Sequence, residues 1–176
     1  MLARGKVERI AGAEGYREVL RGVLAQVAPQ GVDAIGLKAV HGGPEFRGSF
    51  RVTDRVIDAM RAFAAAAPLH NPIYIAAIEV LRELVPEIPL VAVFETGFHR
   101  TISEAAAVYG VPAEWRERFG VRRYGFHGAS HRYVSERVTQ MLEREDLRLV
   151  SCHLGGSSSI CAIRAGVSRD TTMGFS

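Results

Sequence analysis

The run Pro89-Leu-Val-Ala-Val-Phe94 is apolar throughout, and it decides the fold class. A strand with apolar side chains on both faces suits the interior of a parallel sheet, because helices cover both sides of such a sheet. A second apolar strand is predicted over 34–40, and it ends in His41-Gly-Gly43. We therefore predict that the two strands are neighbours in one sheet of an α/β domain, each followed by a functional loop.

Helical patterns surround these strands. Residues 13–28 repeat apolar side chains at helical spacing. Two further helices are predicted from the residue types at their starts, which are an N-cap residue and, in the second helix, a proline in the first turn. The predicted segments are a helix from an N-cap at Thr53 to about Ala66, a helix from an N-cap at Asn71 with Pro72 in its first position to about Leu84, a short helix near 102–108, an irregular stretch around Trp115, and a helix from His127 or Ser130 to Leu142.

The pattern changes at residue 147 to strand, turn and strand. The predicted strands are 147–153, 158–163 and 167–171, with a glycine/serine turn at 155–157. Such a meander resembles the opening of a new unit. We therefore predict one domain over 1–146 and the first strands of a second domain over 147–176.

Composition narrows the class of protein. The chain has 176 residues, is 48% hydrophobic and carries a net charge of +3, with no cluster of Lys and Arg interleaved with aromatic residues. Nucleic-acid binding is therefore not expected. No run approaches the eighteen uncharged apolar residues of a membrane span, so a soluble, cytoplasmic protein without a membrane partner is predicted. Cys152 and Cys161 are predicted to be buried, reduced thiols.

Two segments carry candidate chemistry. Arg122-Arg-Tyr-Gly-Phe-His-Gly-Ala-Ser-His131 combines two arginines with two histidines, and Ser151-Cys-His-Leu-Gly-Gly-Ser-Ser-Ser159 is a glycine/serine turn entered from a strand. Such a turn lets backbone N–H groups approach a phosphate, and a helix that begins at His127 adds further N–H groups. These features indicate phosphoryl transfer, which depends on positioning and charge neutralisation. The structural alternative for His127 is a residue that only caps the helix. A tight hairpin with glycine at positive φ is compatible with phosphate binding, so both are predicted for the glycine/serine turn.

Five motifs, taken in order, resemble the acetate kinase family. They are Pro68-Leu-His-Asn-Pro72, Val91-Ala-Val-Phe-Glu-Thr-Gly-Phe-His99, Arg123-Tyr-Gly-Phe-His-Gly-Ala-Ser-His131, Cys152-His-Leu-Gly155 and Asp170-Thr-Thr-Met-Gly-Phe175. The resemblance implies the acetate and sugar kinase, Hsc70 and actin superfamily. Its members transfer the γ-phosphoryl group of ATP, with Mg²⁺, to a carboxylate such as acetate.

The resemblance also implies a fold. It predicts a ribonuclease-H-like (actin-like ATPase) α/β domain that lacks its first hairpin, followed by the opening strands of a second such domain. Residues 1–146 would then bind the acyl substrate, and 147–176 would begin the nucleotide-binding domain. A homo-oligomer, a dimer in the family, is implied as well.

Roles for individual residues follow from the resemblance alone. Glu95 and His127 are implied as catalytic. The implied substrate-binding residues are Lys38, Val40, Leu69, His70 and Phe126, and the implied nucleotide-phosphate contacts are His153, Leu154, Gly155, Gly156 and Ser157. The family's magnesium ligands match no position of this chain.

Three positions depart from the family pattern. Lys38 replaces an arginine that grips the carboxylate, Glu95 replaces a catalytic aspartate, and Gly156 replaces an asparagine. Lysine keeps the charge but loses the bidentate fork. Family segments at both ends are also unmatched, so the 176-residue chain by itself is predicted to be inactive.

Two other functions remain open. The chain could be a non-catalytic truncated homologue that binds small anions or serves as an interaction module, or it could be part of a propionate kinase. A zinc hydrolase is disfavoured, because His127 and His131 have the required spacing but no Glu follows His127.

Overall fold

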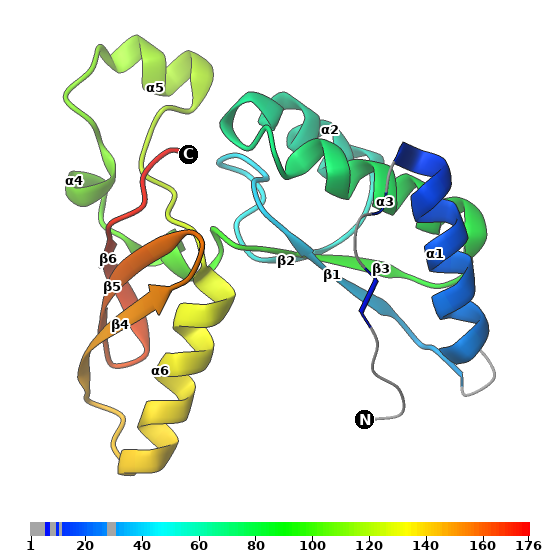
Figure 1. The fold of residues 1–176 in the computed structure, drawn as a ribbon. Helices are drawn as coiled ribbons and strands as arrows, with labels where there is room; N and C mark the ends of the chain where they lie inside the picture. Colours follow the sequence, from blue (N-terminus) through cyan, green and yellow to red (C-terminus); the bar gives the residue numbers. More distant parts are fainter. Residues whose placement is uncertain (1–5, 8–9, 11, 28–30) are drawn as a thin grey trace.

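Two three-stranded sheets and their helices form the fold in a computed structural model that describes residues 6–7, 10, 12–27 and 31–176 (Figure 1). The strands are β1 Ile35–Ala39, β2 Ser49–Arg51, β3 Leu90–Phe94, β4 Arg148–Leu154, β5 Ser158–Arg164 and β6 Val167–Thr171. The helices are α1 Gly12–Val27, α2 Asp54–Ala62, α3 Asn71–Leu84, α4 Glu104–Ala107, α5 Ala113–Phe119 and α6 Gly128–Leu142, with 3₁₀ turns η2 Ala64–Ala66 and η3 Phe98–Thr101. The last position of the helix predicted over 13–28 lies outside the described residues.

The first sheet has the order β1-β3-β2. β1 runs parallel to β3, with Ile35 opposite Leu90 and Ala39 opposite Phe94, which confirms that the two apolar runs are neighbours. β2 pairs antiparallel with the other edge of β3 and was not predicted, because its three residues carry no apolar pattern.

The main core lies between the first sheet and the helices α2 and α3. Alternate residues of β3 face these helices, and Leu90, Ala92 and Phe94 are buried. Met60 of α2 and Ile78 of α3 are buried against them. Each of the larger side chains, Leu90, Phe94, Met60 and Ile78, contributes about 1.5–3 kcal/mol when it leaves water. This packing fixes where β1 and β3 end, and therefore where the following loops begin.

The second sheet is an antiparallel meander in the order β4-β5-β6. Helix α6 packs on β4, while η3 packs on β6 (Figure 1). Because α6 and η3 precede residue 147, elements from both sides of the predicted boundary build this lobe. The boundary at residue 146 stays a prediction.

Two local predictions were wrong near the helices. Helix α3 is capped by His70 rather than by Asn71, whose side chain instead bonds to backbone groups in the core. Trp115 lies in helix α5 rather than in an irregular stretch, because Pro112 begins that helix and Gly120, at φ 64°, ends it.

The two cysteines differ in burial. Cys161 is buried as predicted, but Cys152 is exposed. Successive side chains of a strand point to opposite faces, and Cys152 lies on the outer face of β4. Helix α2 also ends earlier than predicted, at Ala62, with the separate turn η2 carrying the chain to Ala66.

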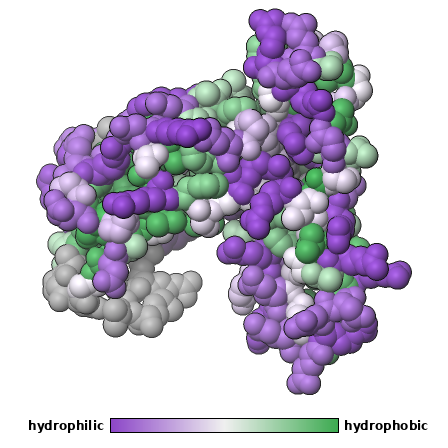
Figure 2. Space-filling model, turned by 180° about the vertical axis from the view of Figure 1, so that it is seen from behind, coloured by the Kyte–Doolittle hydropathy of each residue, from purple (hydrophilic) through white to green (hydrophobic). Residues whose placement is uncertain are grey.

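The surface differs between the two lobes. Seen from behind, the lobe of the first sheet shows apolar surface bordered by polar side chains, whereas the lobe of the second sheet is mostly polar (Figure 2). Among the helices that the structure describes, none has the length and apolar character to cross a membrane. Self-association stays a prediction.

Candidate functional site

The site begins where the parallel strands β1 and β3 end. The Glu95 N–H donates to the Ala39 carbonyl over 2.9 Å, which holds the residues after the two strands side by side. The Lys38 ammonium Nζ lies 3.6 Å from Glu95 Oε1. Carboxyl ends of neighbouring parallel strands are where α/β folds collect ligand-binding groups.

Glu95 is the buried member of this ion pair. Its side chain is 7% exposed, whereas that of Lys38 is 56% exposed. Glu95 Oε2 is buried and has no hydrogen-bond partner among the described residues. A buried carboxylate oxygen normally has a partner, so Oε2 identifies Glu95 as a candidate functional group.

His127 precedes helix α6 and approaches Glu95 through the backbone. It has a left-handed φ of 58°, and the next residue, Gly128, donates its N–H to the Glu95 carbonyl over 3.1 Å. Burial lowers the pKa of His127, the His153 and Lys38 charges lower it further, and Glu95 raises it. The neutral imidazole is therefore favoured at neutral pH.

Gly128 permits this close approach. A Cβ at this position would lie 2.2 Å from the Glu95 carbonyl oxygen and 3.0 Å from Phe98 Cβ. We expect Gly128→Ala to lower the free energy of unfolding by about 1–3 kcal/mol, because backbone has to move to relieve the clash. Urea denaturation measures the loss.

Gly156→Ala is the matched control, since a Cβ there meets no atom within 4 Å. Its expected change is within about 0.5 kcal/mol. Equal stability of the two variants would contradict the close approach of α6 to Glu95.

His153 and His127 stack on each other. Their ring centroids are 3.9 Å apart, with 20° between the planes. Each ring is also fixed through Nδ1, which lies 2.9 Å from Ser130 Oγ in His153 and 2.9 Å from Ser159 Oγ in His127. Nε2 of each ring is therefore the nitrogen left to contact a ligand.

A cavity of about 280 Å³ adjoins these polar groups. Its apolar wall includes Val40, Ala67 and Phe126, which form a buried cluster with Met173 packed against it. The cavity can take a small ligand with one polar and one apolar end. Eight of the predicted site residues line this cavity: Lys38, Val40, Leu69, His70, Glu95, Phe126, His127 and Ser157.

Leu69 and His70 come from the loop before α3. Leu69 is 77% exposed, so it lies at the rim of the cavity. The His70 ring stacks on Tyr74 at a centroid distance of 6.5 Å, and His70 makes no side-chain cap bond to α3. His70 is therefore available to a ligand at the cavity mouth.

The glycine/serine turn between β4 and β5 is only partly in the cavity. Ser157 lines it, whereas Leu154, Gly155 and Gly156 do not. All four residues are exposed, Leu154 by 78%. Neither glycine has a positive φ, so the prediction that this tight turn needs left-handed glycine is wrong, while its phosphate contacts stay a prediction.

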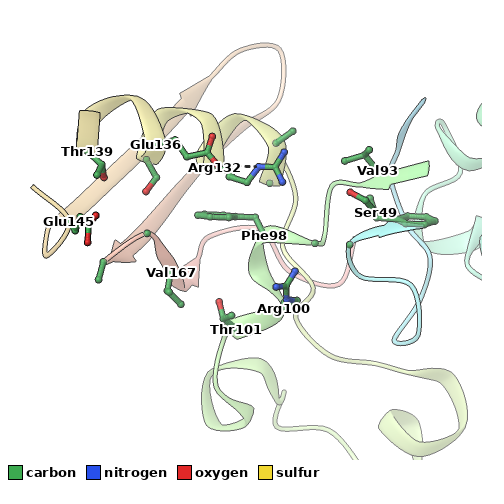
Figure 3. Close-up of a pocket in the computed structure, with 18 residues that line it drawn as sticks. Ser49, Val93, Phe98, Arg100, Thr101, Arg132, Glu136, Thr139, Glu145 and Val167 are labelled. Carbon is green, nitrogen blue, oxygen red and sulfur yellow. Dashed lines mark ion pairs between the residues drawn. The ribbon is translucent and has the colours of Figure 1, made fainter. Parts of the chain in front are cut away.

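A second, larger cavity of about 560 Å³ contains none of the predicted site residues. It lies between the end of β3, η3, helix α6 and the β5–β6 turn (Figure 3). Arg132 pairs with Glu136 at 3.8 Å along one wall, and Arg100 and Phe98 line another. The larger volume does not make it the better candidate, because it has no counterpart of the Lys38–Glu95 pair beside stacked histidines.

Sequence reasoning missed two supports of the site. His99 contacts the Phe126 carbonyl through Nε2 at 2.9 Å and Ser168 Oγ through Nδ1 at 2.9 Å. Since a carbonyl only accepts, His99 carries its proton on Nε2. Ser159 contacts both His127 and His131. No sequence pattern signals such contacts between distant elements.

No group of three or more His, Cys, Asp or Glu side chains that could hold a metal ion occurs in the part of the chain that the structure describes. The polar end of the cavity is formed by the Lys38 ammonium, the buried Glu95 carboxylate and His127, whose ring stacks on His153.

Comparison with known proteins gives consistent similarities. Residues 11–176 match the model of the Acetokinase family. The chain is 49% identical over 146 residues to an acetate kinase of Bacillus subtilis, covering 82% of this chain and 37% of that protein. It is 47% identical over 156 residues to a propionate kinase of Citrobacter rodentium, covering 88% and 38%.

A solved structure agrees with these sequences. The crystal structure of a propionate kinase from Francisella tularensis superposes with a TM-score of 0.84 at 38% identity, and the match covers 90% of this chain and 41% of that one. The chain thus spans about two-fifths of the length of the proteins that it matches.

Proposed function

The chain belongs to the acetokinase family, and from that premise we propose that it is the carboxylate-binding part of a kinase that makes acetyl phosphate from acetate and ATP. One observation carries the proposal: the Lys38–Glu95 pair and His127 meet at the polar end of a small cavity with an apolar wall. The proposal includes a ribonuclease-H-like first domain, a second domain that begins near residue 147, and a homo-oligomer.

The proposed roles follow from chemistry at each end of the cavity. The Lys38 ammonium binds the substrate carboxylate, and Glu95 holds the ammonium in position. Val40, Leu69 and Phe126 contact the methyl group. One methylene is worth about 1–3 kcal/mol in such a pocket, so propionate remains a second candidate substrate.

Phosphoryl transfer would be direct and in line. A carboxylate oxygen attacks the γ-phosphorus, the bond to the β–γ bridging oxygen breaks, and ADP leaves with that electron pair, so no proton has to be transferred. His127 Nε2–H donates to the equatorial oxygens of the transferring group, since Nδ1 is held by Ser159. His70 donates from the cavity mouth.

ATP would enter from the second sheet. In the proposal His153 and the exposed turn 154–157 contact its phosphates, with backbone N–H groups as donors. Magnesium supplies charge neutralisation on the phosphate oxygens when it is bound. No cluster of three or more His, Cys, Asp or Glu side chains that could hold the ion occurs among the described residues.

Acetate binding tests the proposal directly on the 176-residue chain. We expect addition of sodium acetate to the ¹⁵N-labelled protein to shift the amide signals of Val40, Phe126 and His127 in a saturable way, with sodium chloride as the blank. Lys38→Ala is expected to weaken binding at least tenfold, because the carboxylate loses its cation. Arg137→Ala, which removes an exposed cation on α6, serves as the control.

A kinase assay separates the alternatives. With ATP, Mg²⁺ and acetate, we expect no acetyl phosphate above the protein-free blank from the chain by itself. Binding without turnover supports a substrate-binding part of a kinase. Turnover that disappears in His127→Ala would contradict the predicted inactivity, and absence of saturable shifts with both acetate and propionate would contradict the proposal.

A further inference from the structure

Four side chains form a continuous hydrogen-bonded series behind the cavity. Ser151 Oγ lies 2.9 Å from His131 Nδ1, and His131 Nε2 lies 2.8 Å from Ser159 Oγ. The same Ser159 Oγ lies 2.9 Å from His127 Nδ1. The series connects β4, α6 and β5 to the histidine that faces the cavity.

Three members of the series are buried. His131 is 0% exposed, and Ser151 and Ser159 are each 2% exposed. Burial and, to a smaller extent, the neighbouring His99, His127 and His153 together lower the pKa of His131 to about 4. His131 is therefore neutral and carries one N–H, although both of its nitrogens have a serine partner.

Proton counting then allows two arrangements. The Ser159 hydroxyl has one hydrogen and two histidine partners, so it donates to one ring and accepts from the other. In the first arrangement Ser151 donates to His131 Nδ1, His131 Nε2–H donates to Ser159, and Ser159 donates to His127 Nδ1. In the second arrangement every one of these bonds is reversed.

We propose that Ser159 and His131 are positioning residues that couple the tautomer of His127 to that of His131, so that the two neutral rings carry their protons on the same nitrogen. In the first arrangement both rings are protonated on Nε2, and His127 presents Nε2–H to the cavity. In the second, both are protonated on Nδ1. Glu95, whose carboxylate lines the same cavity, favours the first.

When the His127 ring gains a second proton and becomes charged, the tautomer of His131 has to change as well. An imidazolium donates from both nitrogens, so Nδ1–H has to face Ser159, and Ser159 then donates to His131 Nε2. The proton of His131 moves to Nδ1. One proton is gained in total. Because His127 Nε2 already carries a proton in the first arrangement, the added proton enters at the Ser151 end, and each proton of the series moves one place toward His127 Nδ1.

The charged groups that face His127 come from three elements. They are Lys38 at the end of β1, Glu95 after β3 and His153 on β4, while His99 of η3 acts on His131. These groups move the pH at which His127 titrates. They do not change the pairing of tautomers, which is set by the single hydrogen of Ser159.

Long-range ¹H–¹⁵N spectra of the histidine-labelled chain test the inference between pH 8 and pH 5. At pH 8 we expect both His127 and His131 to carry the proton on Nε2. As His127 gains charge, His131 is expected to shift toward the Nδ1–H form with the same midpoint. A merely structural serine would not move a tautomer.

Variants of β5 supply the controls. Ser159→Ala is expected to remove the shared midpoint, so that His131 keeps one tautomer while His127 titrates. Ser159→Thr keeps the hydroxyl and is expected to restore the shared midpoint. Ser158→Ala removes the exposed neighbouring hydroxyl and is expected to change nothing.

Two results would overturn the inference: opposite tautomers in the two rings at pH 8, or a His131 tautomer that stays constant while His127 titrates in the unmodified chain. Neither depends on whether Ser159→Ala folds. The catalytic meaning of the series rests on the proposed function. If the tautomers are paired but acetate does not bind, the proposed function is contradicted and this inference stands. If acetate binds but the tautomers are not paired, only this inference is contradicted.

Discussion

Asn71→Ala is expected to lower the free energy of unfolding by about 3–9 kcal/mol, because it leaves three buried backbone groups without a partner at about 1–3 kcal/mol each. Asn71 is 0% exposed. Its Oδ1 accepts from the His41 N–H over 3.2 Å, and its Nδ2 donates to the carbonyls of His41 and Met60, each over 2.8 Å. Urea denaturation measures the loss as a lower midpoint, and an unchanged m-value shows that the change is one of stability.

Ile73→Ala is the matched control for this prediction. Ile73 lies in the same first turn of α3 but is 47% exposed, so its truncation is expected to cost less than about 1 kcal/mol. A loss below about 1 kcal/mol in Asn71→Ala would contradict the bridging role. Since Asn71 joins α2 to the loop after β1, its replacement is also expected to weaken acetate binding.

The error over Asn71 shows how a local rule can fail. Asparagine before proline at the start of an apolar run is a good N-cap signal, and α3 does begin within one residue of the prediction. The side chain bonds instead to groups at positions 41 and 60. Only the packing of α3 against α2 and β1 brings those groups within reach, and sequence spacing does not encode that packing.

The sheet was easier to predict than the loops around it. Their apolar residues identified β1 and β3 correctly as neighbouring strands. Cover by helices on both faces was wrong for β3, because Leu90, Ala92 and Phe94 are buried whereas Val91 and Val93 on the other face are only half-buried. β2 is only three residues long and pairs with β3 through backbone hydrogen bonds, so it leaves no such signal in the sequence. Cys152 was misjudged because a strand on the surface alternates between a buried and an exposed face.

The site divides in the same way. The structure brings Lys38, His70, Glu95 and His127 to one cavity and stacks His153 on His127, although their roles remain proposals. Motifs identify such residues because each follows a strand or precedes a helix. Ser159 gave no signal, since its importance comes from lying between two histidines of another element.

Acid is expected to destabilise the fold strongly between pH 6.5 and pH 4. Burial lowers the pKa of His41 and of His131 from 6.5 to about 4. In this window the unfolded chain therefore binds more protons than the folded one, and stability falls as the pH falls. It is fully retained above the unfolded pKa of 6.5 and is lost progressively as the pH approaches 4.

The expected size follows from the same two histidines. Each contributes about 2–3 kcal/mol of lost stability by pH 4.5, so together they remove about 4–6 kcal/mol relative to pH 7.5. His99 and His127, whose pKa values burial also lowers, act in the same direction. Urea denaturation at a series of pH values from 7.5 to 4.5 measures how the free energy of unfolding depends on pH.

His41→Gln separates titration from simple damage to the core. His41 is 0% exposed, stacks on Phe63 at 4.8 Å and accepts from the Gly43 N–H over 3.0 Å, so its replacement lowers stability at every pH. Because glutamine does not titrate, the loss between pH 7.5 and pH 4.5 is expected to shrink by about 2–3 kcal/mol. Ile73→Ala is expected to lower the free energy of unfolding by the same amount at every pH, because it removes no titratable group. An unchanged slope in His41→Gln would mean that His41 is protonated in the folded protein as readily as in the unfolded chain, which its burial among aromatic rings argues against.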